Sequence, residues 1–271
     1  MIVEMKDPKK WKSKVYPSVF SLMKHIEANK NLKTNMNSSH RKGDKSFTGV
    51  SNFDEAVAIL KDGSEEIMKG LKTNVKLAVD KLNKELNTQP EGYVADVQGL
   101  FFDVAKVIEG EPEAWYREPW DKVKKPRIKV PIMGAYTANV KTETVIKNAS
   151  EIIALIKALE DNGFECEMAM IFAVNNPSSN QNSYHEIMIK NYDESFNFKK
   201  ISAMLHPSFF RRILFREMEI MFPKTLNDGY GSSSERTLDG FKGGKNFLSL
   251  SKHDSIEKFR HNVLYRLKGK K

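Results

Sequence analysis

The chain has 271 residues and is 40% hydrophobic and 29% charged, so it can bury a core and is not a disordered polypeptide. No run approaches the ~18 consecutive apolar residues of a membrane span, and the N-terminus is charged where a secretion signal would be apolar. We therefore expect a cytoplasmic protein with no membrane partner. Cys166 is the only cysteine, which excludes an internal disulfide and a cysteine-based zinc cage.

Positive charge is concentrated at the two ends of the chain. Residues 1–46 hold 11 Lys and Arg against 4 Asp and Glu, and residues 241–271 hold 9 against 2. The residues between hold 24 against 29, so the ends account for the whole formal net charge of +9. Lys and Arg bind phosphates by releasing counterions, so this distribution favours a nucleic-acid partner, DNA or RNA. The alternative is that lysines simply keep the ends soluble.

The first part of the chain predicts a basic arm followed by a helical hairpin. The arm covers residues 1–46 and contains one short amphipathic helix and a linker rich in Asn, Ser, Lys and Gly from residue 31. The main domain then runs over residues 47–222. It opens with two helices separated by Gly63, which can end the first helix in a left-handed conformation.

The best-defined unit lies in the middle of the chain. Residues 127–133 and 164–174 alternate like strands, and residues 142–163 have the period of an amphipathic helix. This is a βαβ unit, which implies a parallel strand pair. Residues 183–192 return as a third strand, so the sheet is mixed. We predict an α/β (α+β) fold with a mixed sheet built around the βαβ unit and a strand hairpin, flanked by helices.

Two helices are predicted in the last third of the chain. The first begins at Ser208, and its period places Arg212, Arg216 and Glu219 on the solvent face. The second ends the chain, after a loop rich in Gly and Ser, and is basic and amphipathic. Together the loop and this helix form a third unit, residues 223–271.

Known catalytic motifs are absent from the sequence. It has no phosphate-binding GxxxxGK[ST], no GxGxxG after a strand, no GxSxG and no HExxH. The βαβ unit resembles the metal-binding von Willebrand A-type fold, but residues 134–138 (GAYTA) lack the carboxylate of that fold's DxSxS motif. We expect neither a metal nor a cofactor, and we favour a binding protein over an enzyme.

One group of carboxylates is a candidate hard-cation or acid/base site. It lies in a segment rich in Gly, Pro and aromatic residues before the first strand of the βαβ unit. A solvated acidic face is the competing interpretation, because charged side chains are mostly exposed. The candidates are Asp96, Asp103, Glu109 and Glu111.

The candidate nucleic-acid contacts combine cations with aromatic rings, because phosphates meet the charge and bases stack on the rings. They fall just before and within the first strand of the βαβ unit, on the helix that begins at Ser208, and on the C-terminal helix. The alternative is that the rings belong to the core and the lysines protect a strand edge. The set is Trp115, Tyr116, Trp120, Lys122, Lys124, Lys125, Arg127, Lys129, Arg211, Arg212, Arg216, Arg260 and Arg266.

Four stretches occur in an order that resembles an uncharacterised family of phage and mobile-element proteins. They are SFTGVSNFDEAVAILKDGSEE, VADVQGLFFDVAKVIEGEPEAW, KNASEIIALIKALEDNGFECEM and AMLHPSFFRRILFREME. The resemblance covers roughly residues 46–222, implies a viral or mobile-element origin and a host-cell cytoplasm, and carries no catalytic residue.

We therefore expect a non-enzymatic phage-type protein that associates with nucleic acid through its basic ends. The alternative is a protein–protein module, either a virion or assembly component or an inhibitor of a host system. Its contact surface would be the C-terminal helix or the aromatic segment 115–120.

Overall fold

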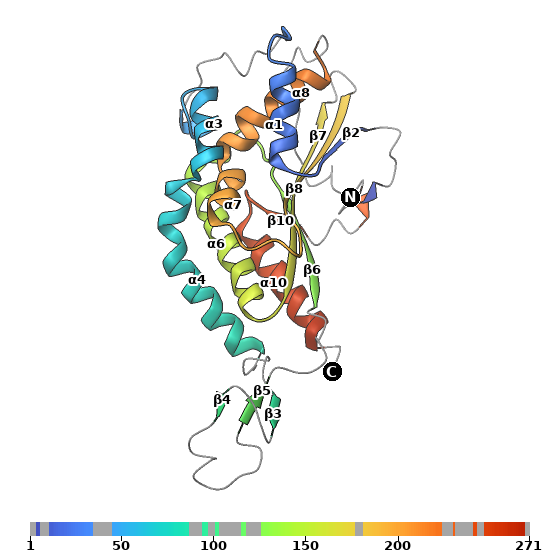
Figure 1. Ribbon diagram of the computed structural model, residues 1–271. Helices are drawn as coiled ribbons and strands as arrows, with labels where there is room; N and C mark the ends of the chain where they lie inside the picture. Colours follow the sequence, from blue (N-terminus) through green and yellow to red (C-terminus); the bar gives the residue numbers. More distant parts are fainter. Residues whose placement is uncertain are drawn as a thin grey trace.

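A five-stranded mixed sheet forms the centre of the computed structural model, with strand order β10-β6-β7-β8-β2 (Figure 1). The described residues are 4–5, 11–34, 45–86, 94–96, 101–102, 115–117, 126–176, 181–223, 230, 241–242 and 247–268. The central strands are β2 (Lys12–Tyr16), β6 (Arg127–Met133), β7 (Glu165–Asn176), β8 (Gln181–Lys190) and β10 (Leu248–Ser249).

Two smaller sheets lie outside the central one. The first pairs β1 (Glu4–Met5) with β9 (Phe241–Lys242), and the second consists of β3 (Val94–Asp96), β5 (Trp115–Arg117) and β4 (Phe101–Phe102). The helices are α1 (Val19–Ala28), α2 (Lys45–Thr48), α3 (Phe53–Asp62), α4 (Glu65–Leu86), α6 (Thr142–Asp161), α7 (Phe198–Leu205), the π-helix η2 (Phe209–Leu214), α8 (Phe215–Met221) and α10 (His253–Lys268).

The predicted βαβ unit and the fold class are confirmed. β6 and β7 are parallel, with Ile132 opposite Met170, and α6 connects them. β8 returns antiparallel to β7, so the sheet is mixed. α6 ends before Gly163, which adopts φ +85, a conformation that favours glycine.

The core lies between the sheet and α6. Because α4 packs on the other side of α6 (Figure 1), 12 of the 20 residues of α6 are buried. A helix enclosed on two sides needs an apolar surface wider than a single stripe. The sequence supplies it with side chains that have no exposed surface, among them Val145, Ile152, Ile153 and Ile156.

Both ends of the chain are built into the central sheet. β2 pairs in parallel with β8 at one edge, and β10 pairs in parallel with β6 at the other. Residues 12–28 therefore contribute to the body, and Leu22 is fully buried. The apolar face of the basic helix α10 is also buried, with Ile256 and Phe259 5% and 4% exposed.

The sequence predicts a short helix over about residues 100–108, but Phe101 and Phe102 form strand β4 and pair with β5, so that prediction is wrong at these two positions. In the part of the chain that the structure describes, no helix has both the length and the apolar character that a bilayer span requires.

Candidate functional site

The most unusual chemistry of the described residues lies on η2 and α8. Five charged side chains within nine positions, Arg211, Arg212, Arg216, Glu217 and Glu219, are at most 3% exposed. Charged side chains are almost never fully buried unless they are paired. A π-helix, here η2, is rare and is frequent at functional sites. This segment is therefore the candidate site.

Arg211 fixes the loop that follows β6. Its guanidinium donates to the backbone oxygens of Thr137 at 3.1 Å and Val140 at 3.0 Å, and to that of Phe47. The guanidinium also lies over two aromatic rings, 4.0 Å from the centroid of Phe47 and 4.6 Å from that of Tyr136. The donors of Arg211 face carbonyl groups in the interior and not the surface, where the predicted contact with phosphate would have to form.

Arg212 and Arg216 hold other loops in the same way. Arg212 donates to the backbone oxygen of Ser51 at 3.1 Å. Arg216 donates to Asn29 O at 2.8 Å and to Leu32 O at 3.0 Å, both just beyond the C-terminal end of α1. The prediction that these two arginines face solvent is wrong, because Arg212 and Arg216 are 3% and 1% exposed.

Glu219, also predicted to be exposed, is buried among donors. Thr34 Oγ1 donates to it at 2.8 Å and Tyr230 OH at 2.7 Å, and Arg216 Nη1 lies 3.2 Å away. A buried carboxylate is stable only when paired and hydrogen-bonded, and Glu219 meets both conditions.

Glu217 is the centre of a second group, which we call the Glu217 cluster: Lys14, Tyr16, His25, His185 and Glu217. Tyr16 OH donates to Glu217 Oε1 at 2.6 Å, and Lys14 Nζ lies 3.1 Å from the same oxygen. His25 Nε2 is 3.4 Å from Oε2, and His185 Nε2 is 3.9 Å from Oε1. The carboxylate has no exposed surface, and its partners come from β2, α1 and β8.

The cluster reaches solvent on one side only. The side chains of Lys14 and His25 are 34% and 31% exposed, and Lys14 Nζ lies 2.7 Å from His25 Nε2. Lys14 thus lies between a buried carboxylate and the imidazole of His25.

His185 is the least satisfied member of the cluster. Neither ring nitrogen has a hydrogen-bond partner among the described residues, and Glu217 Oε2 likewise accepts no hydrogen bond. Burial, together with the charges of Lys14 and His25, lowers the pKa of His185 to about 3. The ring is therefore neutral and packs edge-on against Phe172, with centroids 5.7 Å apart.

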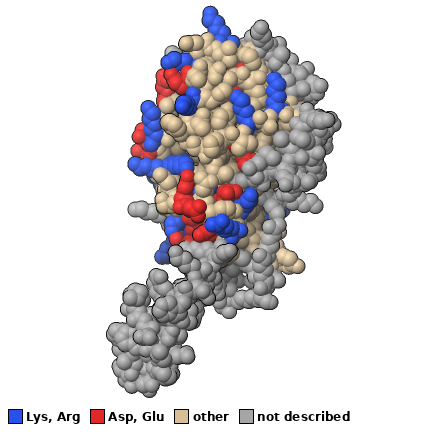
Figure 2. Space-filling model, turned by 45° about the vertical axis from the view of Figure 1, so that its right-hand side comes forward, with Lys and Arg blue, Asp and Glu red and all other residues tan. Residues whose placement is uncertain are grey.

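The predicted cations near β6 are paired on the surface. Arg127 Nε lies 2.9 Å from Glu165, and Lys129 Nζ lies 3.8 Å from Glu167. Basic and acidic side chains lie side by side on the face shown in Figure 2. On α10, Arg260 pairs with Glu257 at 2.5 Å. These pairs weaken the field that the body could direct at a phosphate.

The remaining candidate residues fall into two groups. Asp96, Trp115, Tyr116 and Arg266 lie in β3, β5 and α10, of which only the backbone is described at these positions. Outside the described residues are Asp103, Glu109, Glu111, Trp120, Lys122, Lys124 and Lys125. Within the described ranges, no three His, Cys, Asp or Glu side chains are placed to hold a metal ion.

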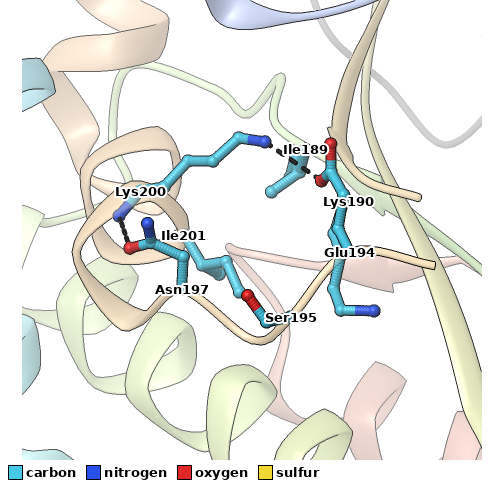
Figure 3. Close-up of a pocket in the computed structure, with 7 residues that line it drawn as sticks. All are labelled: Ile189, Lys190, Glu194, Ser195, Asn197, Lys200 and Ile201. Carbon is cyan, nitrogen blue, oxygen red and sulfur yellow. Dashed lines mark hydrogen bonds and ion pairs between the residues drawn. The ribbon is translucent and has the colours of Figure 1, made fainter. Parts of the chain in front are cut away.

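A hollow of about 280 Å³ lies between the end of β8 and the start of α7 (Figure 3). Lys200 reaches across it to Glu194, with Nζ 3.2 Å from the carboxylate. Lys190 is buried beside it, paired with Glu160 at 2.7 Å and donating to Cys166 O at 3.1 Å. Each cation has its own anion, so the hollow offers no net charge to a ligand.

A larger groove of about 780 Å³ lies among α2, α4 and α6. Its charged lining is balanced, with Lys45 and Lys147 against Glu66 and Glu143. Its two buried hydroxyl groups already have partners: Ser150 accepts from Asn74 at 2.8 Å, and Thr142 donates to Ser46 O. Neither hollow brings together groups for catalysis, and the Glu217 cluster remains the candidate site.

The sequence gives no local signal for this cluster. Lys14 and Glu217 are about two hundred residues apart and meet only because β2 adds to β8 in one register, with Lys14 opposite His185. One signal was present for the buried segment: large apolar side chains occur on every side of the helix from Phe209 to Met218. A helix that is apolar all round is typically enclosed.

A family model described as a domain of unknown function (DUF7192) matches residues 5–268. Among the curated proteins and among the solved structures, nothing matches the chain.

Proposed function

We propose that this chain, which belongs to the DUF7192 family of unknown function over residues 5–268, associates with nucleic acid through its two basic ends. In this proposal the α/β body positions the ends and carries no catalysis. Binding depends on phosphate charge and has little sequence preference.

The observation that carries the proposal is the pairing of β1 with β9. Glu4 lies opposite Lys242 and Met5 opposite Phe241, so the N-terminal basic stretch meets the start of the C-terminal one (Figure 1). The two stretches, each with an excess of seven positive charges, are therefore in contact at this pair of strands. Adjacent positive charges raise the local potential more than the same charges spread apart.

The described surface of the body presents less unpaired positive charge to a polyanion than the two ends do. The arginines of η2 and α8 are used inside the fold, and Arg127 and Lys129 face carboxylates. Attraction to phosphate is thus left to residues 1–46 and 241–271, each of which holds an excess of seven positive charges.

An origin in a phage or another mobile element belongs to the same proposal and is supported by the order of short motifs over residues 46–222. The genes that flank this one provide the test. Neighbours that encode capsid, tail or integration proteins support the origin, whereas housekeeping neighbours in every genome that carries the family reject it.

Fluorescence anisotropy with labelled single-stranded DNA, duplex DNA and RNA tests the binding, at 50 and 200 mM salt. The ends variant changes Lys6, Lys9, Lys10, Lys268, Lys270 and Lys271 to Gln. Substitution is chosen over deletion because β2 and α1 belong to the body. Each lost phosphate contact should reduce the slope of log K against log salt by about 0.9 for duplex DNA.

The matched control removes six lysines from the exposed surface of the body. It changes Lys61, Lys69, Lys76, Lys141, Lys147 and Lys199 to Gln, so that net charge falls equally. We expect the ends variant to lose at least ten-fold in affinity at 50 mM salt and the control to lose less than three-fold. No binding by the wild type, or an equal loss in both variants, rejects the proposal and leaves the protein–protein module as the alternative.

A further inference from the structure

We infer that residues 11–34 form a clasp, a unit of β2 and α1 that detaches from the body and reattaches as a whole while the rest of the protein stays folded. The inference does not depend on nucleic-acid binding. It rests on the way this unit is attached, which is largely through polar groups of α8.

Three side chains of α8 bind the clasp from the body side. Glu217 accepts a hydrogen bond from Tyr16 and forms ion pairs with Lys14 and His25. Arg216 binds the backbone oxygens at the end of α1, and Glu219 accepts from Thr34. One short helix therefore touches the strand, the helix and the end of the unit.

The apolar part of the attachment is smaller than the core of the sheet. In the clasp, Leu22 is fully buried, Ile26 and Tyr16 are 5% and 7% exposed, and Trp11, Val19 and Met23 are only partly buried, whereas most of β7 is buried. Phe20 and Val15 of the clasp are 74% and 50% exposed. A unit with few buried apolar side chains needs less free energy to open than the core does.

The position of β2 also favours local opening. It is the last strand of the central sheet and pairs with β8 alone, while β7 is hydrogen-bonded on both sides. Its burial pattern rises from exposed at Lys12 to buried at Tyr16, so the strand is held most firmly beside Glu217. The Glu217 cluster is therefore where the clasp is fastened.

Opening the clasp has two consequences. The edge of β8 becomes available to another strand, as sheet edges are in strand addition. Lys14 and His25, which Glu217 engages in the closed state, become free to meet other anions. The segment between the clasp and α2, residues 35–44, can span at most about 33–36 Å when fully extended.

Native-state hydrogen exchange of the full chain, followed by mass spectrometry, tests the inference. In the wild type we expect amides of β2 and α1 to exchange at least ten-fold faster than those of β7 and α6, after correction for intrinsic rates. Tyr16→Phe removes one donor to Glu217, and Glu217→Gln removes the charge. Both should accelerate exchange within residues 11–34, by about three-fold and ten-fold, and leave β7 unchanged.

Glu143→Gln is the matched control, because Glu143 is an exposed carboxylate of α6 on the body. It should leave exchange in the clasp unchanged. If Glu217→Gln fails to fold, Tyr16→Phe and the wild type still decide the question. Exchange of β2 and α1 at the rate of β7 in the wild type, or acceleration spread evenly over the body, overturns the inference.

Discussion

Acidification should destabilise this protein through two histidines that the fold keeps neutral. His185 is fully buried and His206 is 3% exposed. Burial lowers the pKa of His185 to about 3, with further lowering by the charges of Lys14 and His25, and burial lowers that of His206 to about 4. In the unfolded chain both rings titrate near the ordinary value of 6.5.

The direction of the change in stability with pH follows from which state, folded or unfolded, binds the proton. Between pH 6.5 and the folded pKa values, the unfolded chain takes up protons that the native state does not, so the stability present above pH 6.5 falls as pH falls. At pH 5 each ring contributes a loss of ~2 kcal/mol relative to pH 8, and the two together ~4 kcal/mol. That is a large fraction of the total stability of a typical domain.

Urea unfolding at pH 8 and pH 5 measures this loss. His185→Phe keeps an aromatic ring against Phe172 and removes the titration. His206→Asn keeps an acceptor for the backbone N–H of Ser208, which His206 Nδ1 now accepts at 3.2 Å.

Each variant should reduce the difference between the two pH values by ~2 kcal/mol. His261→Gln, at an exposed position of α10, is the control and should leave the difference unchanged. An undiminished difference in both buried-site variants would refute the reasoning, because other groups would then carry the acid sensitivity.

Two further predictions concern the backbone and the buried arginines. Gly63 has φ +85, and a Cβ there would lie 3.0 Å from Lys199 Cα, so Gly63→Ala should lower the free energy of unfolding by ~2 kcal/mol. Gly163 has the same φ but open space, so Gly163→Ala should cost only ~1 kcal/mol, and equal losses would contradict the steric argument. Arg211→Lys should lower the free energy of unfolding, measured with urea, by ~3 kcal/mol, because one ammonium group cannot donate to the carbonyl groups of separate loops. A loss below ~1 kcal/mol would show that these carbonyl groups do not need the several donors of a guanidinium.

The βαβ unit could be predicted because its signals are local. Strand β6 has the predicted bounds, and α6 begins at the predicted residue 142 and ends at Asp161, two residues short of the predicted end. Alternation and helical period depend only on neighbours along the chain, and Gly163 marks the end of α6 without reference to the rest of the fold. The same holds for α3 and α4, which Gly63 separates.

β2 was missed because its sequence, KSKVY, looks like a polar arm. It is an edge strand, and lysines at the edge of a sheet are common because they discourage further pairing. Lys14 and Tyr16 become interpretable only when β8 and α8 supply His185 and Glu217 beside them. A contact between segments about two hundred residues apart has no counterpart in the local pattern.

The arginines of η2 and α8 were misplaced for a related reason. Helical spacing puts Arg212 and Arg216 on one face, and a polar face normally meets water. Here that face meets the ends of loops, where Ser51, Asn29 and Leu32 present backbone oxygens that need donors. An arginine can lie in the interior when carbonyl groups accept from its donors, and the sequence pattern does not distinguish such a residue from one that faces water.

The pairing of β2 and β10 with the central sheet shows that the two basic ends are not free tails. A flexible tail could be removed without loss of the fold, but Tyr16 on β2 and Leu248 on β10 are 7% and 0% exposed at opposite edges of the sheet. The match to one family over residues 5–268 agrees with a single unit that includes both. The two edge strands therefore attach both ends of the chain to the body. In the proposed function, a polyanion that binds beside β2 or β10 meets chain that is already ordered at these strands, which loses less conformational entropy on binding than a free tail would.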